Sequence, residues 1–544
     1  MRTRRHLTAM PALVTLWLAL ATAMPAADFE YDLQGPGRNQ ARLTGYTGAG
    51  GDVVVPGTID GFPVTMIAST AFALNSGITS LVIPTGVVSI AGGSFRSCRD
   101  LTSVSLPEGI TRIEDDTFSS SIVLTHVALP QSLDFIGDSA FNNCQNLNDL
   151  ELPDGLTSIG RRAFWGCINL PHATLPESLA SISNEAFSRC RSLKSITVPG
   201  GIGIIGDHVF LQCTSLESVV ISPGITSLGI SAFNACESLE SISLPDGLTS
   251  IGLAAFRDCR LLPNLTLPES LGSIGEIAFE NCSSLESINL PDSLTHLGPG
   301  AFSSCFRLAQ ISIPPGIGTI EDEVFESCGS LTDVTIPDGI TRIGSRAFAS
   351  CSRLVRVTFP ESLTEIGDLA FLSCDELADV SLAEGLVSIG VSTFVRCRSL
   401  MSISIPASVT SLGATAFRQC SALSTICFAG DAPELGEDAF EDTDNLTVYY
   451  QPGTSGWGGG SFGGAPTAPW SAEQRIESIT LGTTTVNLTW SPFGKGSSYA
   501  VQRSADGRSW APVSGFQNVT GTSASIPLPP DAERILLRVL ANGG

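Results

Sequence analysis

Apolar and polar positions follow one pattern along most of this chain, and the pattern returns every 23 residues. The segment 248–268 is one complete copy. Its phenylalanine recurs seventeen times without insertion or deletion, as Phe72, Phe95, Phe118, Phe141, Phe164, Phe187, Phe210, Phe233, Phe256, Phe279, Phe302, Phe325, Phe348, Phe371, Phe394, Phe417 and Phe440. This regularity predicts a stack of repeated units and outweighs any domain count based on the length of 544 residues.

Each repeat predicts two short extended segments and one tight turn. In Leu239-x-x-Ile242-x-Leu244 the apolar residues alternate at the end, which favours a strand with one face inward. The following proline, Pro245, cannot donate to a strand ladder and ends that strand. Leu-Thr-Ser-Ile predicts a second short extended piece, and x-x-Ala-Phe-x-x-Cys predicts a single 3₁₀ or helical turn. Units this short leave no room for a long helix.

A single repeat cannot shield its own apolar residues. Burying each one contributes roughly 1.5–3 kcal/mol, whereas ordering the backbone costs roughly 1–2 kcal/mol for every residue. Neighbouring repeats must therefore cover both faces of each coil. We expect a mainly β solenoid over residues 63–450, in which a polar substitution at a central phenylalanine disrupts two interfaces.

The segments outside the repeats differ from them in composition. Residues 1–27 predict a signal peptide, with Arg2, Arg4 and Arg5 followed by an apolar stretch and small residues suited to cleavage. No later segment has the roughly 18 uninterrupted apolar residues of a membrane span. Residues 28–62 predict an N-terminal cap of short strands, because a solenoid otherwise exposes the core of its first coil.

Beyond the repeats, residues 451–470 are rich in glycine and aromatic residues and predict a C-terminal cap that includes Trp470. Residues 471–544 contain alternating strand segments separated by turn signals such as Asp506-Gly507. This module resembles a fibronectin type III domain, with Trp490 at the position of the core tryptophan of an early strand. The resemblance implies a small β-sandwich, although the tyrosine expected near the last strands is absent.

The repeat itself resembles a known family. The unit Leu-Thr-Ser-Ile-Gly-x-x-Ala-Phe-x-x-Cys-x-x-Leu-x-x-Ile-x-Leu-Pro is similar to the BspA-like leucine-rich repeat of secreted and surface proteins from bacteria and some protists. The resemblance implies a right-handed leucine-rich repeat solenoid with parallel strands along one face. It also implies an adhesin or a protein-binding scaffold without catalytic residues.

Fourteen of the fifteen cysteines occupy one position, three residues after a repeat phenylalanine, and Ser121 fills the one gap in that series. A position filled once per coil is a packing position, where a thiol acts as a small buried apolar group. Stacking brings neighbouring thiols to roughly 5 Å, near disulfide range. Buried free thiols and scattered disulfides therefore both remain open. No CxxC pair gives a zinc-ribbon spacing.

Charge and motifs give no support to an enzyme or to a nucleic-acid partner. The net charge is −24 with 29 basic residues, and clustered Lys and Arg for phosphate contacts are missing from the repeats. The GxGxxG match at 201–206 follows from the repeat register and lacks an adjoining helix. The GxSxG match at Ser461 has no histidine after it in the chain. We expect a non-enzymatic protein without a cofactor.

The outward strand positions are the natural binding surface of a solenoid. Most are small and polar, and His126, Asp149, His172 and Arg356 lie among them. His126 and His172 are two coils apart, roughly 10 Å, with Asp149 between them. This arrangement predicts either a weak cation site or a solvated polar strip. Trp165, at a loop position, is the candidate contact anchor.

The sequence thus predicts an exported scaffold for adhesion or protein binding, secreted or at the cell surface. We expect a monomer whose partner is an extracellular protein or a glycan. The alternative is a rigid spacer that has no ligand of its own.

Overall fold

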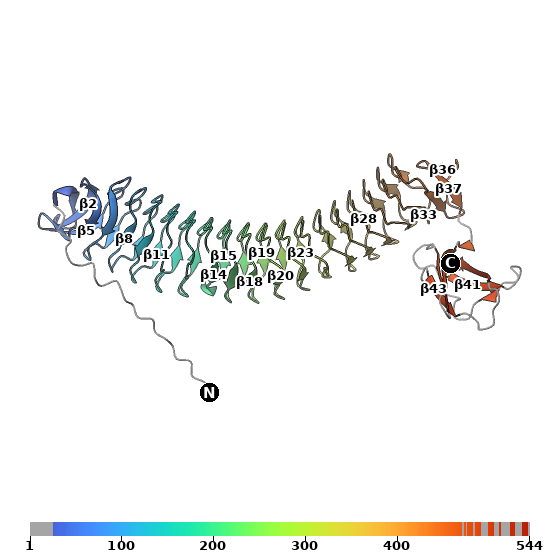
Figure 1. Cartoon of the computed structure of the whole chain (residues 1–544), viewed down its shortest axis with the longest axis horizontal. Helices are drawn as coiled ribbons and strands as arrows, with labels where there is room; N and C mark the ends of the chain where they lie inside the picture. The colour runs from blue at the N-terminus through green and yellow to red at the C-terminus, as the bar shows by residue number, and fades with distance from the viewer. Residues whose placement is uncertain are drawn as a thin grey trace, which may run out of the picture. The chain divides into compact units, whose positions relative to one another are not determined.

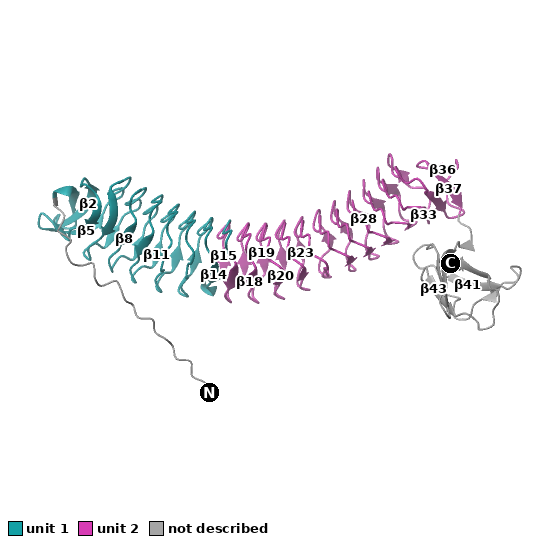
Figure 2. Ribbon diagram, in the orientation of Figure 1, with its two compact units in different colours: residues 1–202, 212–216 teal, residues 203–211, 217–544 magenta. Residues whose placement is uncertain are grey.

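The computed structural model describes residues 26–469 and, after them, seven strands between residues 473 and 541. The signal peptide expected over residues 1–27 lies almost wholly outside the described residues. The chain divides into two compact units, unit 1 with residues 1–202 and 212–216 and unit 2 with residues 203–211 and 217–544 (Figure 2). Within each unit, short strands lie side by side from coil to coil (Figure 1).

The Leu-x-x-Ile-x-Leu segments form the first ladder of parallel strands. In unit 1 it contains β3 (Gly51–Val54), β6 (Ile78–Val82), β8 (Ser103–Ser105), β10 (His126–Ala128) and β14 (Ser195–Val198). In unit 2 it contains β16 (Ser218–Ile221), β18 (Ser241–Ser243), β20 (Asn264–Thr266), β22 (Ser287–Asn289), β25 (Asp333–Thr335), β27 (Arg356–Thr358), β29 (Asp379–Ser381), β31 (Ser402–Ile405), β33 (Thr425–Phe428) and β35 (Thr447–Tyr450). Through most of the ladder, residues 23 apart pair with each other, as Arg356 does with Asp379.

The Leu-Thr-Ser-Ile segments form a second parallel ladder of mostly two-residue strands. In unit 1 it contains β5 (Phe62–Ile67), β7 (Ser89–Ile90), β9 (Arg112–Ile113), β11 (Phe135–Ile136), β12 (Ser158–Ile159) and β13 (Ser181–Ile182). In unit 2 it contains β15 (Ile204–Ile205), β17 (Ser227–Leu228), β19 (Ser250–Ile251), β21 (Ser273–Ile274), β23 (His296–Leu297), β24 (Thr319–Ile320), β26 (Arg342–Ile343), β28 (Glu365–Ile366), β30 (Ser388–Ile389), β32 (Ser411–Leu412) and β34 (Glu434–Leu435). The two extended segments expected per repeat are therefore strands in most coils, and each has a ladder of its own. At Asp149, His172 and Gln310 the first segment forms an isolated bridge.

The turn around the repeat phenylalanine differs from the 3₁₀ or helical turn expected there. The described residues contain 3₁₀ helix at η1 (Ala26–Asp28) and η2 (Gly200–Ile202), and the phenylalanine segments are turns. Ala254 and Asp258, on either side of Phe256, have φ values of 53° and 60°. These left-handed residues direct the N–H of Phe256 to the carbonyl of Ala278 in the next coil, at 2.8 Å. Successive i→i+3 bonds, which a 3₁₀ helix needs, therefore cannot form.

The repeat phenylalanines form a continuous buried column within each unit. Their exposed fractions lie between 0% and 6%. Phe256, for example, stacks on Phe233 and Phe279 with ring centroids 5.5 and 5.2 Å apart. Such aromatic pairs contribute about 0.5–1.5 kcal/mol beyond the burial of their area. The column is therefore a principal source of cohesion between coils.

All fifteen cysteines are buried as thiols without a disulfide. Of the two alternatives that the sequence left open, buried free thiols and scattered disulfides, the structure has the first. The thiols of the fourteen cysteines at the repeat position also donate hydrogen bonds, as at Cys259 and Cys420, a role that the sequence did not suggest. The carbonyl of Phe233 accepts the Cys236 N–H of its own coil at 3.2 Å and the Cys259 thiol of the next coil at 3.3 Å. At the one exception, the Ser121 hydroxyl donates to the Phe95 carbonyl at 2.9 Å. Serine thus replaces cysteine without losing the bond.

Antiparallel strands and aromatic rings lie at the start of unit 1. β1 (Phe29–Gln34) pairs with β2 (Gln40–Tyr46), and β4 (Thr58–Ile59) pairs with β5. Phe29, Tyr46 and Phe72 extend the ring column, with centroids 5.2 and 6.0 Å apart.

A second aromatic cluster follows the last repeat, in unit 2. Trp457 packs against Phe428, Tyr450 and Phe462 with centroids 5.0, 5.3 and 5.1 Å apart. Phe462 also lies 6.2 Å from Phe440, the last ring of the column. Here β36 (Ser461–Phe462) and β37 (Ala465–Pro469) pair in antiparallel fashion. Trp470 lies outside the described residues.

The strands beyond residue 472 pair in two antiparallel sets. They are β38 (Glu473–Gln474), β39 (Ile476–Leu481), β40 (Thr485–Trp490), β41 (Tyr499–Ser504), β42 (Ala511–Pro512), β43 (Ser523–Pro527) and β44 (Leu536–Ala541). The order β39-β40-β43 forms one sheet and β38-β44-β41-β42 forms the other.

Replacing a ring of the column tests its contribution. Phe256→Ala is expected to lower the free energy of unfolding by about 3–5 kcal/mol, because the ring is fully buried between two others. Chemical denaturation followed by far-ultraviolet circular dichroism measures the loss. Phe306→Ala, which removes a ring that is 49% exposed, is the matched control. Equal losses in the two variants would contradict the role of the column.

The thiols predict a loss of stability in alkali. Burial raises the pKa of Cys167 and of Cys213 to about 12 from the usual value of 9.0. Above pH 9 the unfolded chain releases thiol protons that the folded chain keeps, so the free energy of unfolding falls as pH rises from about 9 toward 12. Denaturation midpoints measured from pH 7 to 11 test this. A flat profile would contradict it, and Cys167→Ser/Cys213→Ser should have a shallower fall.

Candidate binding surface

The first ladder presents a row of outward side chains, which we call the strand-face row. Alternate residues of a strand point to opposite faces, so the neighbours of this row, such as Val104 and Val127, are buried. Its members are exposed or half-exposed: Ser80, Ser103, His126, Asp149, His172 and Ser195 in unit 1, and Ser218, Ser241, Asn264, Ser287, Gln310, Asp333, Arg356, Asp379 and Ser402 in unit 2. Core packing does not use these side chains, so they are available to a partner.

The structure brings together two of the three residues in the expected His-Asp-His series. Nδ1 of His126 lies 2.9 Å from Oδ2 of Asp149, with the side chains 47% and 62% exposed. Exposed pairs of this kind contribute little to stability. His172 instead pairs through its backbone with Ser195 of the following coil. In the part of the chain that the structure describes, no group of three or more His, Cys, Asp or Glu side chains is placed to hold a metal ion.

An open hollow of about 260 Å³ lies beside His172. Its polar lining comes from His172, Thr174, Ser195 and Thr197. The preceding residue, Pro171, has no N–H to donate to the preceding coil. In the next coil the corresponding N–H, that of Lys194, does donate to the preceding coil, at 3.1 Å from the Pro171 carbonyl. The proline thus removes a ladder bond next to the hollow.

Trp165 lies on the turn segment, directly after Phe164, and so away from the strand-face row. Its ring is half-buried. The Arg189 guanidinium of the next coil lies 4.9 Å from the ring centroid, a cation–π contact. The Trp165 ring is therefore already in contact with a side chain of the same protein.

Arg356 belongs to the strand-face row and makes an ion pair within it. Its Nε lies 2.8 Å from Oδ2 of Asp379, and the two side chains are 63% and 58% exposed. Asp333 is in register with Arg356 on the other side. These three residues form a charged stretch next to the uncharged residues from Ser218 to Gln310.

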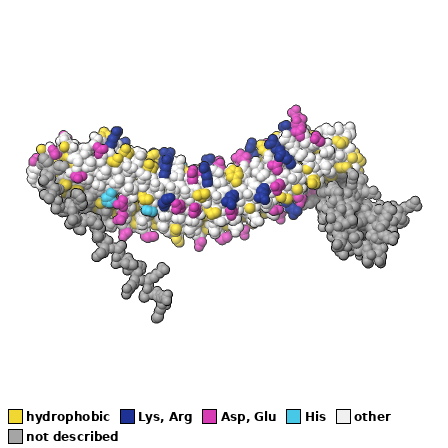
Figure 3. All heavy atoms as spheres, in the orientation of Figure 1, with side chains coloured by type: hydrophobic (Ala, Val, Ile, Leu, Met, Phe, Trp, Pro, Cys, Tyr) yellow, Lys and Arg dark blue, Asp and Glu magenta, His cyan; other side chains and the backbone are white. Residues whose placement is uncertain are grey.

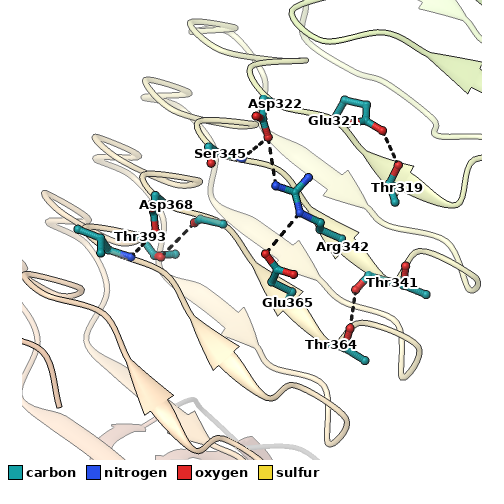
Figure 4. A network of polar contacts seen from close by, with 12 residues as sticks. Thr319, Glu321, Asp322, Thr341, Arg342, Ser345, Thr364, Glu365, Asp368 and Thr393 are labelled. Carbon is teal, nitrogen blue, oxygen red and sulfur yellow. Dashed lines mark hydrogen bonds and ion pairs between the residues drawn. The ribbon is translucent and has the colours of Figure 1, made fainter. Parts of the chain in front are cut away.

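Charged side chains on the face shown in Figure 3 lie in small groups of both signs. Part of the acidity has a structural role that the sequence did not suggest. Oδ1 of Asp322 accepts the backbone N–H of Ser345 in the next coil at 2.8 Å, and it also lies 3.4 Å from Arg342 (Figure 4). An aspartate three residues before the phenylalanine accepts a next-coil N–H in the same way at Asp115, Asp138, Asp207 and Asp368. The recurrence of aspartate three residues before the repeat phenylalanine is the sequence signal that could have revealed this role.

Stacked coils with parallel ladders and a leucine-lined core define a leucine-rich repeat protein. The model of the BspA type leucine rich repeat region matches residues 65–164, 135–261, 226–355 and 318–447. The chain belongs to this family, which confirms the resemblance of its repeat. The family is one of repeat scaffolds, and no catalytic family is indicated.

Several solved structures are similar to this chain. A leucine-rich repeat protein from Bacteroides ovatus is 23% identical, with 82% of this chain and 98% of that chain covered and a TM-score of 0.49. A leucine rich cell surface protein from Faecalibacterium prausnitzii is 27% identical, with 65% and 92% covered and a TM-score of 0.42. The pneumococcal vaccine antigen PcpA is 18% identical, with 82% and 97% covered and a TM-score of 0.34. No curated protein matches the chain.

Among the residues that the structure describes, no helix has both the length and the hydropathy to span a membrane.

The aspartate bonds predict a measurable stability effect. Asp322→Ala is expected to lower the free energy of unfolding by about 1 kcal/mol, because the Ser345 N–H loses its charged acceptor at a half-exposed site. Urea denaturation measures the change. The control is Asp338→Ala, at an exposed turn position of the same coil. A loss no larger than in the control would show that water replaces the aspartate without cost.

Proposed function

We propose that the protein is exported and acts, as a monomer, outside the cell or at its surface as a non-enzymatic scaffold. In this proposal it binds a protein partner through the strand-face row. One observation carries the proposal. The strand-face row follows the first ladder from coil to coil, and its side chains are not packed into the core. The signal-like residues 1–27 support export, and membership of a repeat-scaffold family supports binding.

Each coil has constant inward positions and variable outward positions, and this arrangement supports the proposed function. Phenylalanine, cysteine and leucine side chains fill the interior, and the turn aspartates bind backbone groups of the next coil. What varies from coil to coil is the outward row, which changes from histidine and serine to asparagine, glutamine and arginine. A surface that varies on a constant framework suits recognition.

We also propose the domain organisation expected from the sequence. Residues 28–62 and 451–470 serve as caps of the repeats at 63–450, which the aromatic contacts of Tyr46 and Trp457 support. Residues 471–544 form a fibronectin type III-like sandwich, which the three- and four-stranded antiparallel pairings support. This module serves as a spacer or as a further binding unit.

A glycan is the second candidate partner. It is favoured by the hollow beside His172, where three hydroxyl groups and an imidazole surround buried Ala173 and Ile196. Hydroxyl-bearing sugars suit such polar linings.

Arrays of extracellular proteins and of glycans, probed with the full secreted chain, test the proposal. We expect saturable binding to a protein that weakens about tenfold in the variant Ser287→Arg/Gln310→Arg, which blocks the row. The variant Ser327→Arg/Ser350→Arg, on the turn segments, is the matched control and should bind as the unaltered chain does. Mass analysis of the secreted chain checks the removal of the signal.

The other outcomes are equally definite. Binding to glycans alone, lost in Ser195→Arg, would replace the protein partner by the second candidate. The absence of binding on both arrays would contradict a binding function and favour the rigid spacer. Binding that both double variants weaken alike would place the contact outside the strand-face row.

A further inference from the structure

Three consecutive coils of unit 2 carry an apolar residue immediately before the strand-face row. We call Val355, Ala378 and Met401 the apolar column. Ala378 is exposed, and Val355 and Met401 are 41% and 67% exposed. Elsewhere in unit 2 the residues at the same offset are Glu217, Glu240, Pro263, Glu286, Ala309, Thr332 and Ser424. The position therefore tolerates charge, and the apolar column is a run of three consecutive apolar residues there.

Packing within the chain does not account for these side chains. The residue before each member of the column is a leucine that is fully buried, as at Leu354 and Leu400. The Ala378 N–H donates to the Val355 carbonyl at 3.0 Å, so neighbouring members lie on adjacent coils. Single exposed apolar residues are common on proteins, whereas large contiguous apolar patches mark interaction surfaces; the column brings three such residues onto consecutive coils.

The charged stretch of the strand-face row borders the apolar column. Arg356 is paired with Asp379. Asp333, one coil before Val355, makes no ion pair with any described residue. The surface is thus an apolar column with an unpaired carboxylate at one end, which complements a partner that carries apolar groups followed by a cation.

The spacing of the column selects the kind of partner. Coils are about 4.8 Å apart along a ladder, so Val355 and Ala378, which precede the paired strands β27 and β29, follow one another at about that interval. An α-helix places residues i, i+3 and i+7 at about 0, 4.5 and 10.5 Å along its axis. Same-face residues of an extended strand are about 6.6 Å apart, so an extended peptide would not match the interval of about 4.8 Å between coils.

The sizes of the three side chains add to this match. Ala378 is small and comes between the larger Val355 and Met401, so the partner's largest apolar side chain is expected opposite Ala378. Methionine adapts its shape to different apolar surfaces. β29 and β31 belong to different sheets, so the ladder that joins the coils of Val355 and Ala378 does not extend to the coil of Met401.

We propose that the apolar column and Asp333 bind an amphipathic helix of a protein partner, lying along the coil stack with a Lys or Arg at the Asp333 end. This proposal rests on the proposed function as a protein-binding scaffold and assigns the surface and the chemistry of its partner. Helices that present an apolar stripe at i, i+3 and i+7 are a common binding element of proteins.

A synthetic peptide tests the proposal on the full chain. The probe is a helix-favouring peptide of about 18 residues with a leucine stripe at i, i+3 and i+7 and lysines at one end. We expect saturable binding by fluorescence anisotropy, weakened about tenfold by Met401→Glu. A peptide with glutamate in place of lysine, and one with the same composition but no stripe, should bind at least that much more weakly.

A second exposed valine provides the matched control. Val391 is 44% exposed and lies two residues after β30 of the second ladder, away from the first ladder. Val391→Glu introduces the same charge into the neighbouring part of the chain and should leave peptide binding unchanged. Equal denaturation midpoints for the two variants establish that both are folded.

Four results would overturn the proposal. The first is the absence of saturable binding by the lysine peptide, and the second is equal weakening by Met401→Glu and Val391→Glu. The third is concentration-dependent self-association that Met401→Glu abolishes, which would give the surface to a second copy of the chain. A protein found on the arrays whose binding Met401→Glu leaves intact would keep the proposed function and exclude this surface.

Discussion

Each coil depends on the next one for both packing and hydrogen bonds. The carbonyl of Phe233 accepts a backbone N–H from its own coil and the thiol of Cys259 from the following coil. The Phe256 ring lies between two other rings, and the Phe256 N–H reaches Ala278 in the next coil. Inserting one residue would shift the rings, thiols and ladders out of register together. This shared dependence gives a physical reason for seventeen phenylalanines at one constant spacing.

The parts of the fold that follow from periodicity could be predicted from the sequence. Leucine and isoleucine alternation placed both strands, and one cysteine per coil indicated a buried position. The turn was not predictable in the same way. Ala254 and Asp258 adopt left-handed backbone conformations without the glycine that usually signals them. The expected helical turn was wrong because hydrogen bonds to the next coil hold these residues in place, and a single repeat gives no sign of those bonds.

The candidate site shows the same limit. Alternation along a strand placed His126, Asp149, His172 and Arg356 on one exposed row. Which of them touch depends on side chains and backbone groups of adjacent coils. His126 meets Asp149, whereas Pro171 removes a ladder bond beside His172. The cation–π contact of Trp165 is made by Arg189 of the next coil. No sequence motif indicates that these two residues are in contact.

The constraint that makes the fold regular also determines where specificity can reside. Inward positions serve two neighbours at once, so a change there affects both interfaces. Outward positions make at most exposed ion pairs between coils, as Arg356 does with Asp379, and such pairs add little to stability. A coil can therefore carry methionine where another carries glutamate, as Met401 and Glu286 do at one offset. Departures from the repeat at such positions therefore carry more information about a partner than the repeat itself. The change from acidic to apolar residues between those coils is such a departure, and recognition on this scaffold is accordingly local to a few coils.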